Sequence, residues 1–397
     1  MTNDKTVREP LFQISKRDGV VWYKAWFIRA LAVLGALVLS SLLVIFIVGK
    51  NPLRIWESIF SGSFGTKTKF WIMFEDLAIL LAIAIAVTPA FKMKFWNIGA
   101  EGQVLVGCLA AAACSFYLGG KVAPVILIIL MVLTSVLAGA IWAVIPAIFK
   151  AKWNTNETLF TLMMNYIATY LVLFFLNVWV KSGSGTLGIL PHGQFPKILN
   201  NEYLLPIIVI LFVTGIMFVY LKYSKQGYEI SLVGESVNTA RYAGVNVGKV
   251  IIRTLIISGA ICGLTGGLLV GAINHTLTDS LAGGRGFTAI LVSWLAKFNP
   301  LYMILTAFAV VFFQKGANQL ATDFSGVITE SFGEIIVGII FLFIIGCEFF
   351  ISYKITIRKR KPVEEQNPSL ETDTTNTVTE ITEEVIDLRK TQTKEDK

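Results

Sequence analysis

The sequence has few charged residues and almost no histidine. Charged side chains make up 15% of its 397 residues, against about 25% in soluble domains. It contains two histidines and four cysteines, and the cysteines show no CxxC spacing, so the sequence predicts no metal site and no disulfide. The motifs GxxxxGK[ST], HExxH and GxSxG are absent, and each is tied to a known kind of catalytic or phosphate site. We therefore expect no enzymatic activity and no cofactor.

Long apolar runs dominate the sequence, 55% of which is hydrophobic. A run of about 20 apolar residues crosses the hydrocarbon core of a membrane as a helix, because only a helix satisfies its own backbone hydrogen bonds there. Besides nine clear runs of this kind, a tenth crossing, as a short or broken helix, is expected within 280–297. The predicted fold class is an all-α polytopic membrane protein with about ten transmembrane helices. The nine clear runs lie near 26–48, 70–90, 98–118, 122–149, 157–180, 203–221, 250–273, 301–320 and 334–353.

The positive charges predict the topology. With ten crossings and both termini in the cytoplasm, the inner segments carry 19 lysines and arginines and the outer segments eight, as the positive-inside rule requires. The same excess makes nucleic-acid binding an unneeded explanation of the net charge of +8. The predicted domains are a cytoplasmic N-terminal segment (1–25), a transmembrane domain (26–353) and a cytoplasmic, largely disordered acidic tail (354–397).

Polar side chains inside apolar spans are costly and mark functional sites by default. Glu75 and Asp76 are expected near the outer interface, and Lys315 is expected to extend its amine toward the membrane surface. Other polar residues are candidates for a substrate pathway, with hydrogen bonding to a neighbouring helix as the alternative. These candidates are Asn97, Glu101, Gln103, Asn165 and Tyr166.

Two glycine-rich interruptions, Gly99–Gly102 and Gly283–Gly286, occupy comparable places in the two halves of the chain. Paired broken helices indicate an internal repeat and a central substrate path, whereas the alternative is a pair of tight turns. Between them, four glycines recur every fourth residue and predict a bare helix face for close packing; a weaker repeat runs through Ser135, Gly139 and Ala143. The four glycines are Gly259, Gly263, Gly267 and Gly271.

The inner segment 222–249 is the longest one within the membrane domain. Ser236 is a good N-cap and Gly244 a good residue to follow a helix end, so the sequence predicts a short amphipathic helix of about two turns. Such a helix suits docking into a groove of a soluble partner. A helix resting on the lipid surface is the alternative.

Parts of the chain resemble a known family. Phe95–Gln103 (FWNIGAEGQ), Gly234–Gly244 and the later GRGFTAILVSWLAKFNP are similar to permease subunits of bacterial ABC importers of the branched-chain amino acid, ribose and nucleoside class. Similarity runs from about 70 to 350, and Thr161–Ala168 (TLMMNYIA) fits the nucleoside branch, which is served by basic-membrane-protein lipoproteins. Trp294 and Ala296 depart from the family pattern, where smaller residues or glycine are common.

The resemblance implies a type II importer architecture in the bacterial plasma membrane. It implies as partners ABC ATPase subunits, a second related permease chain and an extracytoplasmic solute-binding lipoprotein, besides membrane lipid. ATP hydrolysis would lie on the ATPase chains, and Asn97–Gln103 would line or shape the translocation path. The resemblance also implies a coupling helix that docks on the ATPase, with the residues Gly234, Glu235, Asn238, Ala240, Arg241 and Gly244.

The expected function is therefore ATP-driven import of nucleosides. A sugar or branched-chain amino acid permease of the same fold is the alternative within this class. An ion-coupled secondary transporter is the alternative outside it, although such a carrier would need several carboxylates in the middle of the membrane.

Overall fold

The computed structural model describes residues 12–16, 22–48, 52–180 and 185–324, together with part of the segment 335–357. The chain divides into two compact units, one formed by residues 1–28 and 348–397 and the other by residues 29–347. Of the predicted largely disordered acidic tail (354–397), residues 354–357 belong to a strand and residues 358–397 lie outside the described residues. In the segment 335–357 the described residues are 335, 338, 339, 342, 343, 345–347, 349–351 and 353–357.

The first unit contains a two-stranded antiparallel sheet. Strand β1 (Phe12–Lys16) pairs with β2 (Tyr353–Ile357), so that Phe12 lies opposite Ile357. The expected all-α polytopic membrane fold fits the mostly helical chain, and this small sheet is an addition to it. The alternation of apolar and polar residues in FQISK suits a strand, but its partner lies more than 300 residues away and no local signal identifies it.

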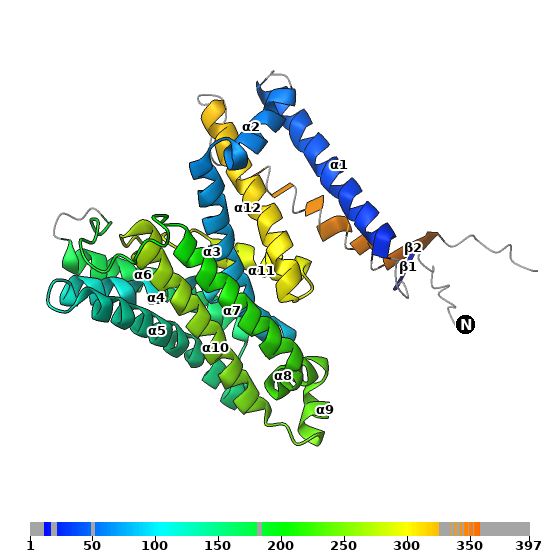
Figure 1. Ribbon diagram of the computed structural model, residues 1–397. Coiled ribbons are helices and arrows are strands. Elements are labelled where there is room, and N and C mark those ends of the chain that lie inside the picture. Colours follow the sequence, from blue (N-terminus) through cyan, green and yellow to red (C-terminus); the bar gives the residue numbers. More distant parts are fainter. Residues whose placement is uncertain are drawn as a thin grey trace, which may run out of the picture. The chain divides into compact units, whose positions relative to one another are not determined.

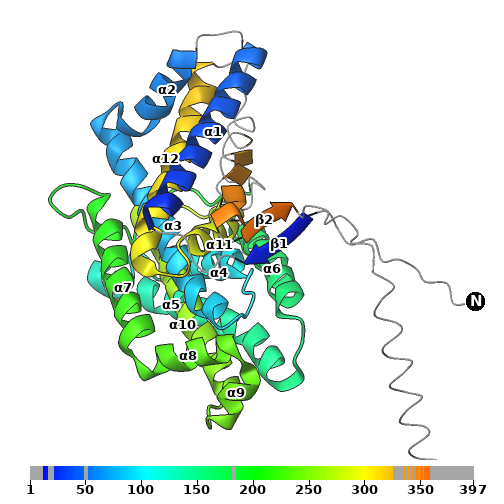
Figure 2. The same ribbon diagram turned by 90° about the vertical axis from the view of Figure 1, so that its right-hand side faces the viewer.

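Helices account for most of the rest of the described chain (Figures 1 and 2). Most are long. The shortest are α9 and the π-helix η1, which directly continues α10, with six residues each, followed by α8 and α11 with 11 residues each. The helices are α1 (Trp22–Val48), α2 (Pro52–Phe64), α3 (Lys67–Lys92), α4 (Ala100–Leu118), α5 (Pro124–Trp153), α6 (Glu157–Trp179), α7 (Leu204–Tyr223), α8 (Lys225–Glu235), α9 (Val237–Tyr242), α10 (Val247–Leu268), η1 (Leu269–Asn274), α11 (Arg285–Leu295) and α12 (Pro300–Asp323).

Seven of the described helices are long and apolar enough to cross a membrane, namely α3 to α7, α10 with η1, and α12. Each of them coincides with a predicted run. Helix α1 covers the first predicted run, and α11 lies in the predicted tenth crossing. At 11 residues, α11 rises about 16 Å, roughly half of a hydrocarbon core. The prediction of a short helix there is confirmed, whereas the total of ten crossings is not.

Close backbone packing joins α10 to α5 and α4. A Cβ added to Gly259 would overlap the backbone oxygen of Gly139, and one added to Gly263 would overlap the oxygen of Ser135. These two glycines of the predicted face thus lie against the weaker small-residue repeat of α5. Gly267 faces the Ser135 hydroxyl, while Gly271 instead faces the ring of Phe195.

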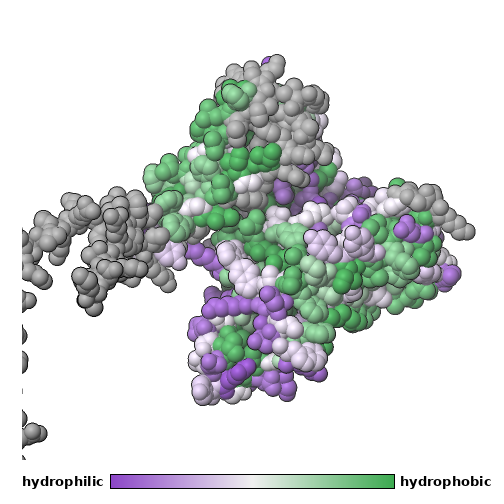
Figure 3. Space-filling view, turned by 180° about the vertical axis from the view of Figure 1, so that it is seen from behind, coloured by the Kyte–Doolittle hydropathy of each residue, from purple (hydrophilic) through white to green (hydrophobic). Residues whose placement is uncertain are grey.

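The outer surface of the helices is apolar. Helix α5 exposes an apolar residue at every fourth position, on the face away from its glycine contact. Figure 3 shows hydrophobic side chains over much of the flank, with hydrophilic ones gathered at the end where α8 and α9 lie. A surface of this kind suits lipid on the flank and water at the end. The exposed α5 residues are Val125, Ile129, Leu133, Leu137 and Ile141.

Candidate functional site

The segment between α3 and α4 turns back into the protein as non-helical chain. Lys94 adopts a left-handed conformation (φ 59°), and α4 does not begin until Ala100. Asn97 in this segment is completely buried. Its Oδ1 accepts hydrogen bonds from the backbone N–H of Gly99 (3.1 Å) and from Gln103 Nε2 (3.3 Å), while its Nδ2 donates to Ser258 Oγ on α10 (3.2 Å). The side chain therefore fixes a break that the backbone alone would leave unsatisfied.

Asn165 holds the same segment from the side of α6. Its Oδ1 accepts a hydrogen bond from Gly102 N–H (2.9 Å), and its Nδ2 donates to the carbonyl of Ile98 (3.0 Å). The neighbouring Tyr166 points elsewhere, because 56% of it is exposed on the surface of α6. Of the five predicted pathway residues, four therefore lie in or beside this break and Tyr166 lies apart from them.

Glu101 connects the two glycine-rich interruptions. Its Oε1 accepts a hydrogen bond from Gly284 N–H and its Oε2 accepts one from Gly286 N–H, both at 2.7 Å. Gly284 and Gly286 flank the first residue of α11, so the carboxylate caps the positive end of that helix dipole. The two breaks, which are 183 and 185 residues apart in these contacts, meet at one carboxylate.

An ion cluster lies on the other side of the α11 N-terminus. Arg285 donates to Asp76 Oδ1 on α3 at 2.8 Å, and Lys315 Nζ on α12 contacts Asp76 Oδ2. The side chains are mostly buried, with 21% of Asp76, 32% of Arg285 and 26% of Lys315 exposed. The expectation that Lys315 reaches outward is wrong, because a partly desolvated ammonium gains more from a carboxylate than from a distant surface.

Two buried oxygens near the Asn97 network have no hydrogen-bond partner among the described residues. These are Oε1 of Gln103 and Oγ1 of Thr254, the latter one turn before Ser258 on α10. Unpaired buried polar atoms cost free energy, so these two oxygens are the unsatisfied part of the buried polar network. The sequence did not single out Thr254 or Ser258, since a hydroxyl in an apolar helix usually bonds the carbonyl four residues earlier.

The predicted short helix of segment 222–249 is confirmed as α9. Ser236 caps it, accepting a hydrogen bond from Thr239 N–H (3.2 Å), and Gly244 follows its end with φ 78°. Ala240 is completely buried, whereas 93% of Tyr242 is exposed. The other candidate coupling residues divide in the same way, because Glu235, Asn238, Arg241 and Gly244 are exposed and Gly234 is buried.

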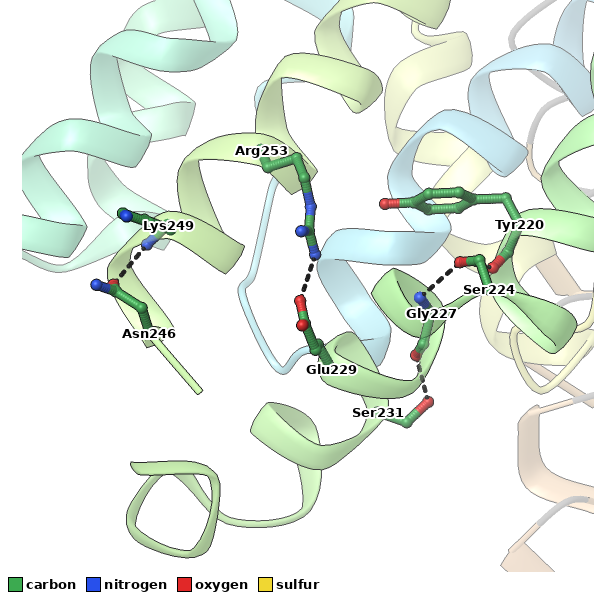
Figure 4. A network of polar contacts seen from close by, with 8 residues as sticks. All are labelled: Tyr220, Ser224, Gly227, Glu229, Ser231, Asn246, Lys249 and Arg253. Carbon is green, nitrogen blue, oxygen red and sulfur yellow. Dashed lines mark hydrogen bonds and ion pairs between the residues drawn. The ribbon is translucent and has the colours of Figure 1, made fainter. Parts of the chain in front are cut away.

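Helix α8 anchors this segment to the bundle (Figure 4). Glu229 of α8 forms an ion pair with Arg253 of α10 (3.0 Å). Ser224 caps α8, accepting from Gly227 N–H (3.0 Å) and donating to the carbonyl of Tyr220 (2.6 Å). A Cβ on Gly234 would overlap the backbone oxygen of Lys92, the last residue of α3. The exposed residues of α9 thus stand on a base fixed to α3, α7 and α10.

The ion cluster of Asp76, Arg285 and Lys315 was not predicted from the sequence. Arg285 lies within the predicted glycine-rich interruption Gly283–Gly286, but nothing local indicates its partner. Asp76 and Lys315 were noted, but 209 residues separate Asp76 from Arg285 and no spacing rule joins them. A charged residue in an apolar run nevertheless implies a partner of opposite sign. Matching the positive and negative charges of the apolar runs could therefore have indicated this cluster.

Apolar helices broken at two places around buried polar groups, with short exposed helices at one end, define a membrane transport permease. The chain belongs to the family described as branched-chain amino acid transport system / permease component, which it matches over residues 70–345. It is accordingly an ABC importer permease, a multi-pass protein of the plasma membrane and a transport component.

Individual relatives are similar over most of their length. The guanosine ABC transporter permease protein NupP of Bacillus subtilis is 28% identical over 76% of this chain and 88% of its own. The glucose ABC transporter permease protein TsgB13 of Haloferax volcanii is 26% identical over 87% of this chain and 93% of its own. The nucleoside ABC transporter permease protein NupB of Lactococcus lactis is 25% identical over 69% and 79%.

Proposed function

We propose that the chain is the permease of an ATP-driven nucleoside importer. Two of the relatives named above are guanosine and nucleoside permeases, and Thr161–Ala168 fits that branch. Asn165 of this segment clamps the α3–α4 break through two hydrogen bonds, which ties the segment to the polar centre. A sugar importer of the same fold is the second candidate, since TsgB13 is a glucose permease.

In this proposal the buried polar residues at the two breaks line the solute path. Asn97, Glu101, Gln103 and Asn165 supply its amide and carboxylate groups. The free acceptor of Gln103 suits the hydroxyl groups of a ribose. Tyr166 has a different role, in which its exposed ring contacts lipid.

Partner ATPase subunits drive the transport through α9. The observation that carries this step is the exposed surface of α9, where Arg241 and Tyr242 project from a helix that is capped at Ser236 and fixed through α8. An exposed, rigid helix end transmits force better than a free loop. A second related permease chain and a solute-binding lipoprotein complete the proposed complex.

The proposed topology places both termini in the cytoplasm. Strand β1 precedes α1 and β2 follows the last helix, and the two strands pair directly. Since paired strands lie on one side of a membrane, their pairing supports an even number of crossings.

An uptake assay tests the solute. The complex, purified with its ATPase, second permease and binding lipoprotein, is reconstituted in vesicles and supplied with labelled guanosine, glucose or leucine. We expect ATP-dependent accumulation of guanosine alone. Accumulation of glucose or leucine instead assigns the chain to the alternative solutes, and accumulation driven by an ion gradient without ATP contradicts the proposal.

A substitution tests the coupling role. Arg241→Ala removes an exposed charge from α9, and we expect solute-stimulated ATPase activity and uptake to fall together while the membrane domain stays folded. Lys121→Ala is the control, because Lys121 is also an exposed cation but lies between α4 and α5. Unchanged uptake in the Arg241 variant, with the complex intact, would show that α9 does not couple.

A further inference from the structure

The structure attaches α11 to α3 at both of its ends. At the first residue of α11, Arg285 pairs with Asp76 Oδ1 at 2.8 Å. Near its last turn, Ser293 Oγ donates to the carbonyl of Ala84 on α3, also at 2.8 Å. A helix held at two points to the same neighbour moves with that neighbour, so α3 and α11 form one body.

Helix α3 also reaches the exposed segment. Its C-terminal residue, Lys92, lies in backbone contact with Gly234 of α8. The distance along α3 from Asp76 to Lys92 is 16 residues, which is about 24 Å of helix. Every residue of α3 from Leu77 to Phe91 is buried, and a close-packed helix of this kind transmits displacement rather than absorbing it.

The remaining contact of the α11 N-terminus is with a different helix. Glu101, on the first turn of α4, holds the N–H groups of Gly284 and Gly286. If α3 and α11 move together, this contact with α4 must change, as must the hydrogen bond from Thr306 Oγ1 of α12 to the carbonyl of Val292 on α11 (3.3 Å). The contact with α4 lies where the two breaks meet, among the residues proposed to line the solute path.

We infer that Asp76 is a positioning residue of the transporter, which holds α11 on α3 so that displacement of α8 and α9 reaches the contact between Glu101 and α11. The inference rests on the coupling role proposed for α9. Asp76 touches no solute in this account. Lys315 of α12 holds its second oxygen and so fixes the carboxylate between two cations.

The test combines two measurements on the whole complex carrying Asp76→Asn. Hydrogen exchange of the amides of Gly284 and Gly286, followed by mass spectrometry, needs no solute. We expect their exchange to speed up by at least about tenfold, because loss of a partly buried ion pair favours local opening. Uptake should fall about tenfold, whereas basal ATP hydrolysis should remain within about twofold, because the ATPase subunits are untouched.

Two further variants separate positioning from a loss of folding. Arg285→Lys keeps the charge at the α11 N-terminus and should restore most of the exchange protection and uptake that Arg285→Gln loses. Glu202→Gln is the matched control, since it also breaks a 2.8 Å ion pair, with Lys197, but an exposed one. It should change neither readout.

The outcomes distinguish the inference from the proposed function. Wild-type exchange rates at Gly284 and Gly286 in Asp76→Asn would overturn the inference, whatever the solute. Parallel loss of uptake, ATP hydrolysis and complex assembly in both Arg285 variants would also overturn it, since Asp76 would then be purely structural. A wild-type complex without ATP-driven uptake would refute the proposed function alone.

Discussion

Replacing Gly263 by alanine should separate α10 from α5. The added Cβ would overlap the backbone oxygen of Ser135 and lie 3.2 Å from the Cα of Gly139. Neither atom can swing aside as a flexible side chain can, so α5 itself must shift. Overpacking of this kind costs about 1–3 kcal/mol, of which the higher helix propensity of alanine offsets roughly 0.5–1 kcal/mol. The expected net destabilisation is therefore about 0–2.5 kcal/mol.

Gly215→Ala is the matched control. Gly215 lies within α7 with no heavy atom within 4 Å of the added Cβ, so this variant keeps the propensity gain and has no clash. Since the propensity gain is common to both, the two variants should differ by the clash alone, roughly 1–3 kcal/mol, with Gly263→Ala the less stable. Unfolding of the purified protein in detergent, followed by tryptophan fluorescence, measures the difference. If Gly263→Ala were as stable as Gly215→Ala, the close α5–α10 contact would be wrong.

Three further predictions concern the polar centre. Asn165→Ala should lower the unfolding free energy by about 2–6 kcal/mol, since it leaves the N–H of Gly102 and the carbonyl of Ile98 buried without partners at about 1–3 kcal/mol each. Tyr166→Phe should leave stability unchanged in the same unfolding assay, because its ring is exposed on α6; a large loss would place Tyr166 in the network. Glu101→Gln should reduce guanosine uptake in vesicles several-fold, since a neutral amide caps a helix dipole more weakly than a carboxylate; wild-type uptake would make the charge unnecessary.

Features that depend on near neighbours in the chain could be predicted well. The apolar runs gave the positions of seven membrane-capable helices, because length and hydrophobicity are local properties. Ser236 and Gly244 gave the limits of α9, since capping acts within one turn. The glycine spacing predicted a packing face on α10 but could not select α5 as its partner.

Features that depend on distant parts of the chain could not be predicted. Strand β1 pairs with β2, which lies more than 300 residues further along the chain. Asp76 pairs with Arg285, which lies 209 residues further along. Lys315 was expected at the surface because a long side chain can reach it, and only the packing of α12 against α3 brings the amine to Asp76 instead. The role of Glu101 as a cap likewise requires α11 to lie beside α4.

The sequence by itself determined that this chain crosses a membrane many times, where its helices break and where a short capped helix stands exposed. Hydrophobic length, glycine spacing and capping chemistry act over a few residues, so they can be read in order along the chain. Only the tertiary structure decided which helices meet and which charges neutralise one another. Those choices follow from burial, since a charge removed from water must find its partner in space, wherever that partner lies in the sequence.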